Sequence, residues 1–124
     1  MRILLTGAAG FIGFHAVQAL LGRDHEVVGV DSLNAYYNPS LKRARLAEIG
    51  SAKAFRFIQL DIADNAALGA ALKGERFDIV LHLAAQAGVR YAIKDPAAYT
   101  QSNLVGHQNM LELARHMEIG RAHV

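Results

Sequence analysis

The sequence has no cysteine and no tryptophan, and only two of its 124 residues are proline. The absence of cysteine excludes a disulfide framework and a metal site built on thiolates, and it fits a reducing compartment. No apolar run approaches the length of a membrane span, and the chain starts directly on an apolar strand pattern that leaves no room for a signal peptide. We therefore expect a cytoplasmic protein without a membrane partner.

The sequence also has little net charge, because 13 Lys and Arg against 11 Asp and Glu give a formal charge of +2. The cations are scattered, which is typical of a solvated surface and gives no case for a nucleic-acid partner. By contrast, 52% of the residues are hydrophobic, which is ample material for the core of one domain. The five histidines outside the predicted strands show no paired ligand spacing, so we predict no metal site.

The first stretch of the chain, MRILLTGAAGFIG, carries the strongest local signal. Residues 3–5 predict a short buried strand, and apolar residues then return at helical spacing. Between them lies Gly7-x-x-Gly10-x-x-Gly13. A strand that turns on glycine into a helix directs free backbone N–H groups at one point, where a pyrophosphate fits. Spaced glycines are also typical of any tight turn, but the strand before and the helix after are the context that a phosphate-binding turn requires.

Strand and helix patterns alternate through the rest of the chain. Further strands are predicted at residues 27–30, 55–60 and 77–83. Helices are predicted to begin at the caps Asn38, Asp64 and Asp95, the last ending near residue 117. This alternation predicts an α/β fold: a Rossmann-like, doubly wound parallel sheet with strand order 3-2-1-4, which stops after about four strand–helix units. Residues 1–118 would form this incomplete domain.

Polar residues follow the predicted strands, at the edge where such folds bind ligands. Asp31 closes the second strand, where a carboxylate accepts hydrogen bonds from both hydroxyls of an adenosine ribose and repels a 2′-phosphate, which favours NAD over NADP. Asp61 and Ile62 follow the third strand and suit an adenine. For Asp31 and Asp61, the alternative to a ligand contact is that the carboxylate only caps a turn. Arg43 and Arg45 are interpreted as part of the solvent-exposed face of a helix rather than as a phosphate-binding site.

Four motifs, in order, resemble the extended short-chain dehydrogenase/reductase family: Thr6-Gly7-x-x-Gly10-x-x-Gly13, Asp61-x-x-Asp64, DIVLHLAA at residues 78–85, and Asn103-x-x-Gly106. Within that family, DSLNAYY at 31–37, LKRARL at 41–46 and AAQAGVRY at 84–91 are most similar to the UDP-glucuronate 4-epimerases. Related nucleotide-sugar 4,6-dehydratases share parts of these stretches. A fragment of such a dehydratase, or an NAD-binding module without catalysis, therefore stays open as an alternative.

The resemblance implies a set of NAD contacts and two substrate contacts. The implied NAD contacts are Gly7, Gly10, Phe11, Ile12 and Gly13 at the pyrophosphate, Asp31, Ser32 and Asn34 at the adenosine ribose, Asp61 and Ile62 at the adenine, Leu83, Ala84 and Ala85 beneath the cofactor, and Ser102 near the nicotinamide. Gln86 and Arg90 would face a UDP-sugar, where a guanidinium suits a sugar carboxylate. A surface arginine is the alternative for Arg90, and His82, inside a strand, is expected to be structural.

The catalytic part of such enzymes has no counterpart in this sequence. The family base is the tyrosine of a Tyr-x-x-x-Lys pair, and none of the four tyrosines has a lysine four positions later. We therefore expect the NAD-binding part of a parent epimerase, itself inactive, with a homodimer formed by the full-length parent.

The end of the sequence carries a separate expectation. Residues 119–124 resemble the translation of a sequencing adapter, with a natural tail as the alternative. Without a fifth strand, the fourth would present an open edge, which predicts a marginally stable or aggregating product with weak NAD binding.

Overall fold

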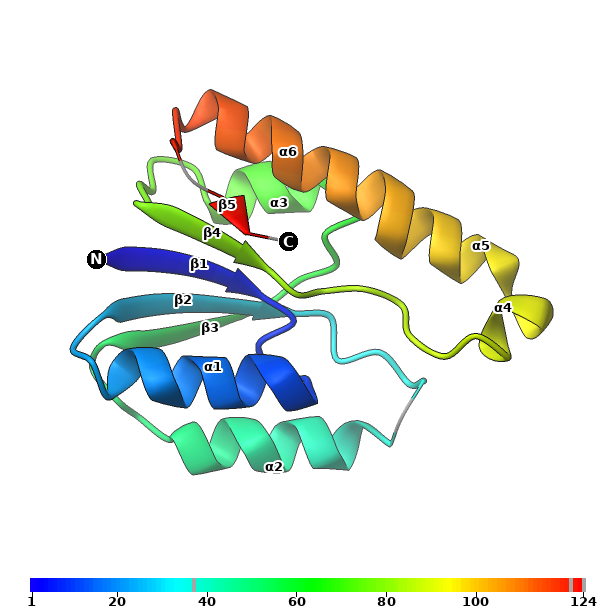
Figure 1. The fold of residues 1–124 in the computed structure, drawn as a ribbon, viewed down its shortest axis with the longest axis horizontal. Coiled ribbons are helices and arrows are strands. Elements are labelled where there is room, and N and C mark those ends of the chain that lie inside the picture. The colour runs from blue at the N-terminus through cyan, green and yellow to red at the C-terminus, as the bar shows by residue number, and fades with distance from the viewer. Residues whose placement is uncertain (37, 121, 124) are drawn as a thin grey trace.

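Parallel strands form one sheet in the computed structural model, which describes residues 1–36, 38–120 and 122–123. The order is β3-β2-β1-β4-β5, with β1 at Arg2–Thr6, β2 at Glu26–Asp31, β3 at Phe55–Gln59, β4 at Ile79–His82 and β5 at Ala122–His123. Helices α1 (Phe11–Leu21) and α2 (Pro39–Ile49) cover one face, and α3 (Asn65–Ala71) and α6 (Gly106–His116) cover the other (Figure 1). The predicted doubly wound sheet of order 3-2-1-4 is confirmed.

The central strand β1 is buried because it has a partner on each side. Leu4 pairs in register with Val28 of β2 and with Val80 of β4. Its side chain lies in the core on the side of α3 and α6, whereas Leu5, the next residue, packs on the side of α1. Side chains of successive strand residues point to opposite faces of the sheet. Because helices cover both faces here, successive residues of β1 must all be apolar. Complete burial of each such side chain contributes about 1.5–3 kcal/mol.

The predicted helix caps are present at each expected position. The side chain of Asn38 accepts a hydrogen bond from the N–H of Ser40 at the start of α2, and that of Asp64 accepts one from Ala67 at the start of α3. Gly50 ends α2 with a φ of 70°, a left-handed conformation that glycine adopts without strain.

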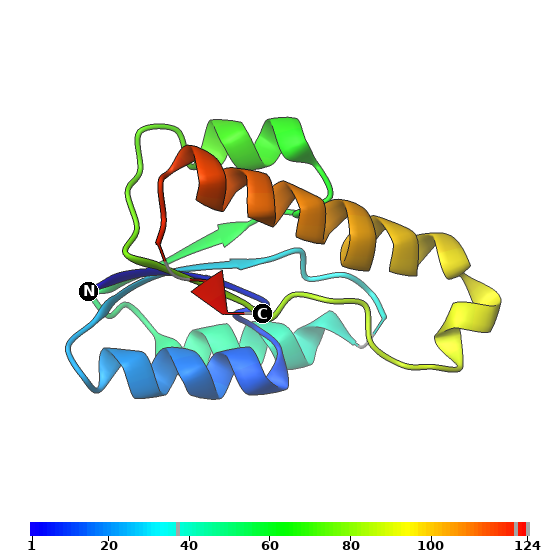
Figure 2. The same cartoon turned by 45° about the horizontal axis from the view of Figure 1, so that its top comes forward.

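The last predicted helix is more complex than its sequence pattern indicates. Asp95 caps α5 (Pro96–Tyr99) as predicted, but the coil then widens into a π-helical segment, η1 (Thr100–Val105), before it continues as α6. A short helix that was not predicted, α4 (Tyr91–Lys94), precedes α5. Figure 2 shows these two short helices, in yellow, extending beyond the end of the sheet.

The expectation of an open edge along β4 is wrong at two positions. Val80 and Leu81 of β4 pair in parallel with residues 122 and 123 of β5. The backbone of β4 therefore has a short partner within the stretch that was interpreted as a tail. Residues 121 and 124 of this stretch, and Tyr37 of the DSLNAYY motif, lie outside the described residues.

Candidate functional site

The turn between β1 and α1 depends on two glycines for close backbone contact. Gly7 has a φ of 74°, and a Cβ placed on it would lie 2.9 Å from backbone atoms of Leu83 and Ala84. A Cβ on Gly13 would lie 1.9 Å from the carbonyl oxygen of Gly7. Because real Cβ atoms do not approach backbone this closely, no other residue fits either position without a shift of the turn. Glycine here brings the start of α1 directly against the ends of β1 and β4.

The amino terminus of α1 has free hydrogen-bond donors. Its cap residue, Gly10, has no side chain that could accept from the first turn, and no acceptor in the described chain contacts the N–H groups of Phe11, Ile12 or Gly13. Unpaired N–H groups at a helix start, together with the helix dipole, attract an anion. The turn therefore fits a pyrophosphate, as its glycine spacing predicts.

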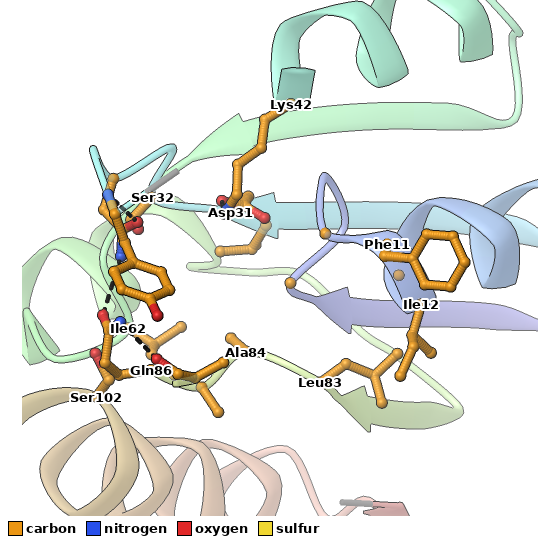
Figure 3. A pocket seen from close by; sticks show the side chains of 18 of the residues that line it. Phe11, Ile12, Asp31, Ser32, Lys42, Ile62, Leu83, Ala84, Gln86 and Ser102 are labelled. Carbon is orange, nitrogen blue, oxygen red and sulfur yellow. Dashed lines mark hydrogen bonds and ion pairs between the residues drawn. The ribbon is translucent and has the colours of Figure 1, made fainter. Parts of the chain in front are cut away.

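These donors lie at one end of a cavity of about 540 Å³ along the carboxyl edge of the sheet. Figure 3 shows Phe11 and Ile12 at one end of it and Gln86 and Ser102 at the other. Every NAD contact predicted from the sequence is among the lining residues, as is Gln86. Arg90 is not among them; it is exposed at the start of α4. The lining residues that sequence reasoning did not assign to the site are Val30, Tyr36, Leu41, Lys42, Arg45, Leu60 and Ala87.

Asp31 is buried at the middle of this cavity, with 4% of its surface exposed. Its Oδ2 accepts from the N–H of Ala9 at 3.1 Å, and its Oδ1 accepts from the N–H of Leu33 at 2.9 Å. Oδ1 also forms an ion pair of 2.9 Å with Nζ of Lys42. The turn-capping alternative considered for this aspartate is thus realised, and it is combined with a place in the cavity wall.

Two cations of α2 that the sequence analysis did not assign to the site line the cavity. Lys42 lies near the start of α2, where the helix dipole disfavours a cation, so its position was a signal that a nearby acid holds it. Arg45 was interpreted as solvated, but its guanidinium donates to the carbonyl of Ala9 at 3.1 Å and lies 6.0 Å from the centre of the Phe11 ring. Arg43 is exposed, as expected.

The floor of the cavity is fixed by Thr6. Its hydroxyl oxygen accepts from the N–H groups of Leu83 and Ala84, both at 3.1 Å, and so it donates its own proton to Nδ1 of His82 at 2.7 Å. Burial lowers the pKa of His82, and the nearby His107 lowers it further. A neutral, hydrogen-bonded His82 confirms the structural role expected for it.

The loop after β4 is held by the π-helical segment. The side-chain amide of Asn103 accepts from the N–H of Gln86 at 2.8 Å and donates to the carbonyl of Gln86 at 3.2 Å. These are the two backbone hydrogen bonds that a neighbouring strand would otherwise form with Gln86. Its neighbour Ser102 lines the cavity. A second hollow of about 600 Å³ adjoins the first and shares Asn34, Tyr36, Asp61, Gln86 and Ser102 with it. Gln86 therefore lies at the boundary between two spaces.

The described residues contain neither a metal-binding cluster nor a membrane-spanning helix. No group of three or more His, Cys, Asp or Glu converges on a point where a metal ion would bind. None of the helices in these ranges is both long enough and apolar enough to cross a bilayer.

Comparison with known proteins adds a family match. The sequence model of one protein family, described as "NAD dependent epimerase/dehydratase family", matches residues 3–124. A probable UDP-glucuronate 4-epimerase of Rhizobium meliloti is 46% identical over 115 residues, which are 93% of this chain and 34% of that protein. UDP-glucuronate 4-epimerase 4 of Arabidopsis thaliana is 47% identical over 115 residues, 93% of this chain and 26% of that protein. The chain thus spans about a third of the length of such relatives or less.

Solved structures match nearly the whole chain. The UDP-glucuronic acid 4-epimerase of Bacillus cereus, in complex with UDP-glucuronic acid and NAD, has a TM-score of 0.84 and 36% identity; the match covers 98% of this chain and 38% of that one. A dTDP-glucose 4,6-dehydratase of Streptomyces venezuelae with NAD bound has a TM-score of 0.83, again with 36% identity over 98% of this chain and 38% of that one.

Proposed function

Because the chain belongs to the NAD-dependent epimerase/dehydratase family, we propose that its cavity binds NAD. The observation that carries the proposal is the glycine turn with the uncapped start of α1, which opens into the same cavity as the buried Asp31. The pyrophosphate lies against the N–H groups of Phe11, Ile12 and Gly13. Anion binding at this point needs no cationic side chain, since backbone donors and the helix dipole supply the attraction.

The rest of the cavity accommodates the other parts of the dinucleotide. The adenosine ribose lies beside Asp31, with Ser32 and Asn34 at its rim, and the adenine lies between Asp61 and Ile62. The nicotinamide half extends over Leu83, Ala84 and Ala85 towards Ser102. All these residues line the one cavity. When bound, NAD supplies a hydride acceptor; the residues named here bind and orient it.

For the longer protein that this chain would form part of, we propose C4 epimerisation of a UDP-sugar, with UDP-glucuronate converted to UDP-galacturonate. Support comes from curated relatives named UDP-glucuronate 4-epimerase at 46–47% identity. Gln86, at the boundary of the two hollows, is the better placed of the two residues assigned to the sugar, while Arg90 would have to turn inward from its exposed position. The chain alone is proposed to be inactive, because its sequence holds no Tyr-x-x-x-Lys pair.

A sugar-nucleotide 4,6-dehydratase is the second candidate. The dehydratase of Streptomyces venezuelae matches this chain at the same 36% identity as the epimerase of Bacillus cereus. A cytoplasmic location and a homodimer of the full-length parent stay predictions from the sequence. The exposed side chains of Leu104 in η1 and Leu111 in α6 agree with a contact through this helix.

NAD binding is tested by isothermal titration of the purified chain with NAD. The informative variant is Ile12→Glu, which places a carboxylate among the donors of α1. We expect it to lower the affinity for NAD roughly tenfold or more, because like charges repel at the phosphate site. The matched control is Gln18→Glu, which adds the same charge at an exposed position of the same helix. No heat of binding in the unmodified chain, or an equal loss in both variants, would contradict the proposal.

A further inference from the structure

The hydroxyl of Thr6 uses its full hydrogen-bonding capacity within the protein. A hydroxyl carries one donor and two acceptor lone pairs. Its lone pairs accept from the N–H groups of Leu83 and Ala84, and its proton goes to Nδ1 of His82. Because Thr6 is 0% exposed, water does not replace a bond that is lost here.

Protonation of His82 is incompatible with this arrangement. A charged imidazole carries a proton on both ring nitrogens, so Nδ1 becomes a donor. The oxygen of Thr6 must then accept from Nδ1, and its own proton must turn towards one of the two backbone N–H groups, which loses its acceptor. The N–H of Leu83 also contacts the carbonyl of Thr6 at 3.2 Å, whereas no second acceptor contacts that of Ala84 in the described chain.

The two N–H groups belong to the floor of the cavity. Leu83 and Ala84 both line it. Their backbone also packs against the turn between β1 and α1, since a Cβ on Gly7 would lie 2.9 Å from atoms of both residues. A shift of Ala84 therefore changes the cavity floor and the support of the glycine turn together.

The charge of His82 depends on groups from two neighbouring elements. Thr6 faces it from β1 and does not titrate, and His107 faces it from α6 with the ring centres 5.4 Å apart. Burial and His107 both lower the pKa of His82, and no carboxylate among the described side chains offsets them. His82 is therefore neutral at neutral pH and takes up a proton only as the pH falls below about 6.5.

We propose that His82 is a positioning residue of the cavity, and that its protonation, relayed through Thr6, weakens the binding of the dinucleotide. In the neutral state Thr6 holds both Leu83 and Ala84, and in the charged state it releases one of them. The nicotinamide ring of NAD is itself a cation, so a charged His82 adjoining the floor adds repulsion in the same direction. The inference rests on the proposed binding of NAD and gives His82 a role beyond packing.

The first test needs neither a cofactor nor a substitution. In the isotope-labelled chain, the amide resonances of Leu83 and Ala84 are followed by NMR from about pH 8 to about pH 5, together with the ring resonances of His82. We expect at least one of the two amides to shift with the same midpoint as the ring. Amides that do not follow His82 would overturn the proposal.

The second test is isothermal titration with NAD over the same pH range, with circular dichroism to verify that each protein is folded. In the unmodified chain, we expect the affinity to fall at least about fivefold towards low pH, as the loss of one hydrogen bond predicts. The matched control is His116→Asn, which removes an exposed histidine near the end of α6 and should show the same fall.

Two further variants separate the relay from other titrations. In His82→Asn, whose side-chain oxygen accepts from Thr6 without titrating, the affinity should change less than about twofold over this range. In His107→Asn, the midpoint of the fall should move to higher pH, because a group that lowers the pKa of His82 is gone.

The outcomes distinguish the inference from the proposed function. An equal pH dependence in the unmodified chain and in His82→Asn, or tighter binding at low pH, would overturn the inference. If the amides of Leu83 and Ala84 follow His82 but NAD does not bind at any pH, the proposed function is wrong, and the proton-linked change of the floor stands without it.

Discussion

At the scale of single residues, His82 is a buried titratable group whose environment couples protonation to folding. It is 7% exposed, its Nδ1 accepts from Thr6, and its pKa is lowered by burial and by His107. A histidine whose pKa is lower in the folded state binds fewer protons there than in the unfolded chain. The contribution of His82 to the free energy of unfolding is therefore fully present above about pH 6.5, the ordinary pKa of histidine. This contribution is lost as the pH falls through the lower pKa of the folded state.

We predict that the melting temperature falls less steeply between pH 7 and pH 5 in His82→Asn than in the unmodified chain. Asparagine provides an oxygen that can accept from Thr6 but does not titrate. The measurement is a series of thermal melts followed by circular dichroism at half-unit pH steps. Parallel pH profiles in the two proteins would show that His82 does not carry the dependence.

The sequence predicted which residues line the cavity, but not the contacts that they make within the protein. Asp31 lies where its position after β2 indicates, but its contacts with Ala9 and Lys42 depend on how α2 returns across the strand end. Such a contact joins residues on separate elements, and neither local spacing nor composition encodes it. The same reason explains why Arg45 was interpreted as a solvated residue.

At the scale of elements, the glycines of the first turn and of α3 should respond in opposite directions to alanine. Gly13→Ala places a Cβ against the carbonyl of Gly7, and relief of this contact requires a backbone shift. We expect it to destabilise the fold by at least about 2 kcal/mol and to weaken NAD binding. The measurement is urea unfolding followed by titration with NAD.

Gly69→Ala is the matched control for this substitution. A Cβ on Gly69 meets nothing within 4 Å, and the residue lies in the interior of α3. The same exchange should here stabilise the fold by about 1 kcal/mol, because alanine is the better helix former. A stabilising effect at both positions would mean that the turn tolerates a side chain.

Helices and strands that carry a clear start or stop signal were predicted, and those without one were not. Asn38, Asp64 and Asp95 cap helices as their sequence context indicates. By contrast, α4 has no side-chain cap at its start, and its four residues are too few for a periodic pattern. The widening at η1 depends on how the helix packs, which residue type alone does not reveal.

At the scale of the whole molecule, the pairing of β5 with β4 protects one edge of the sheet. Deletion of residues 120–124 would remove the partner of Val80 and Leu81. We predict a lower melting temperature and more light scattering on concentration, since unpaired strand edges associate with one another. Deletion of residue 124 alone is the control, because it leaves both paired positions of β5 in place. Equal behaviour of both shortened chains would mean that the short strand contributes nothing.

The widened turn of η1 has a consequence for the molecule as a whole. Successive residues of an α-helix are offset by about 100°, so an added residue within one turn rotates everything beyond it by about that angle. Met110 in α6 is buried in the core, whereas Asn103 in η1 reaches sideways to Gln86. Loss of a single residue between them would bring the two ends of the helix out of phase, leaving either the core or the loop after β4 without its partner.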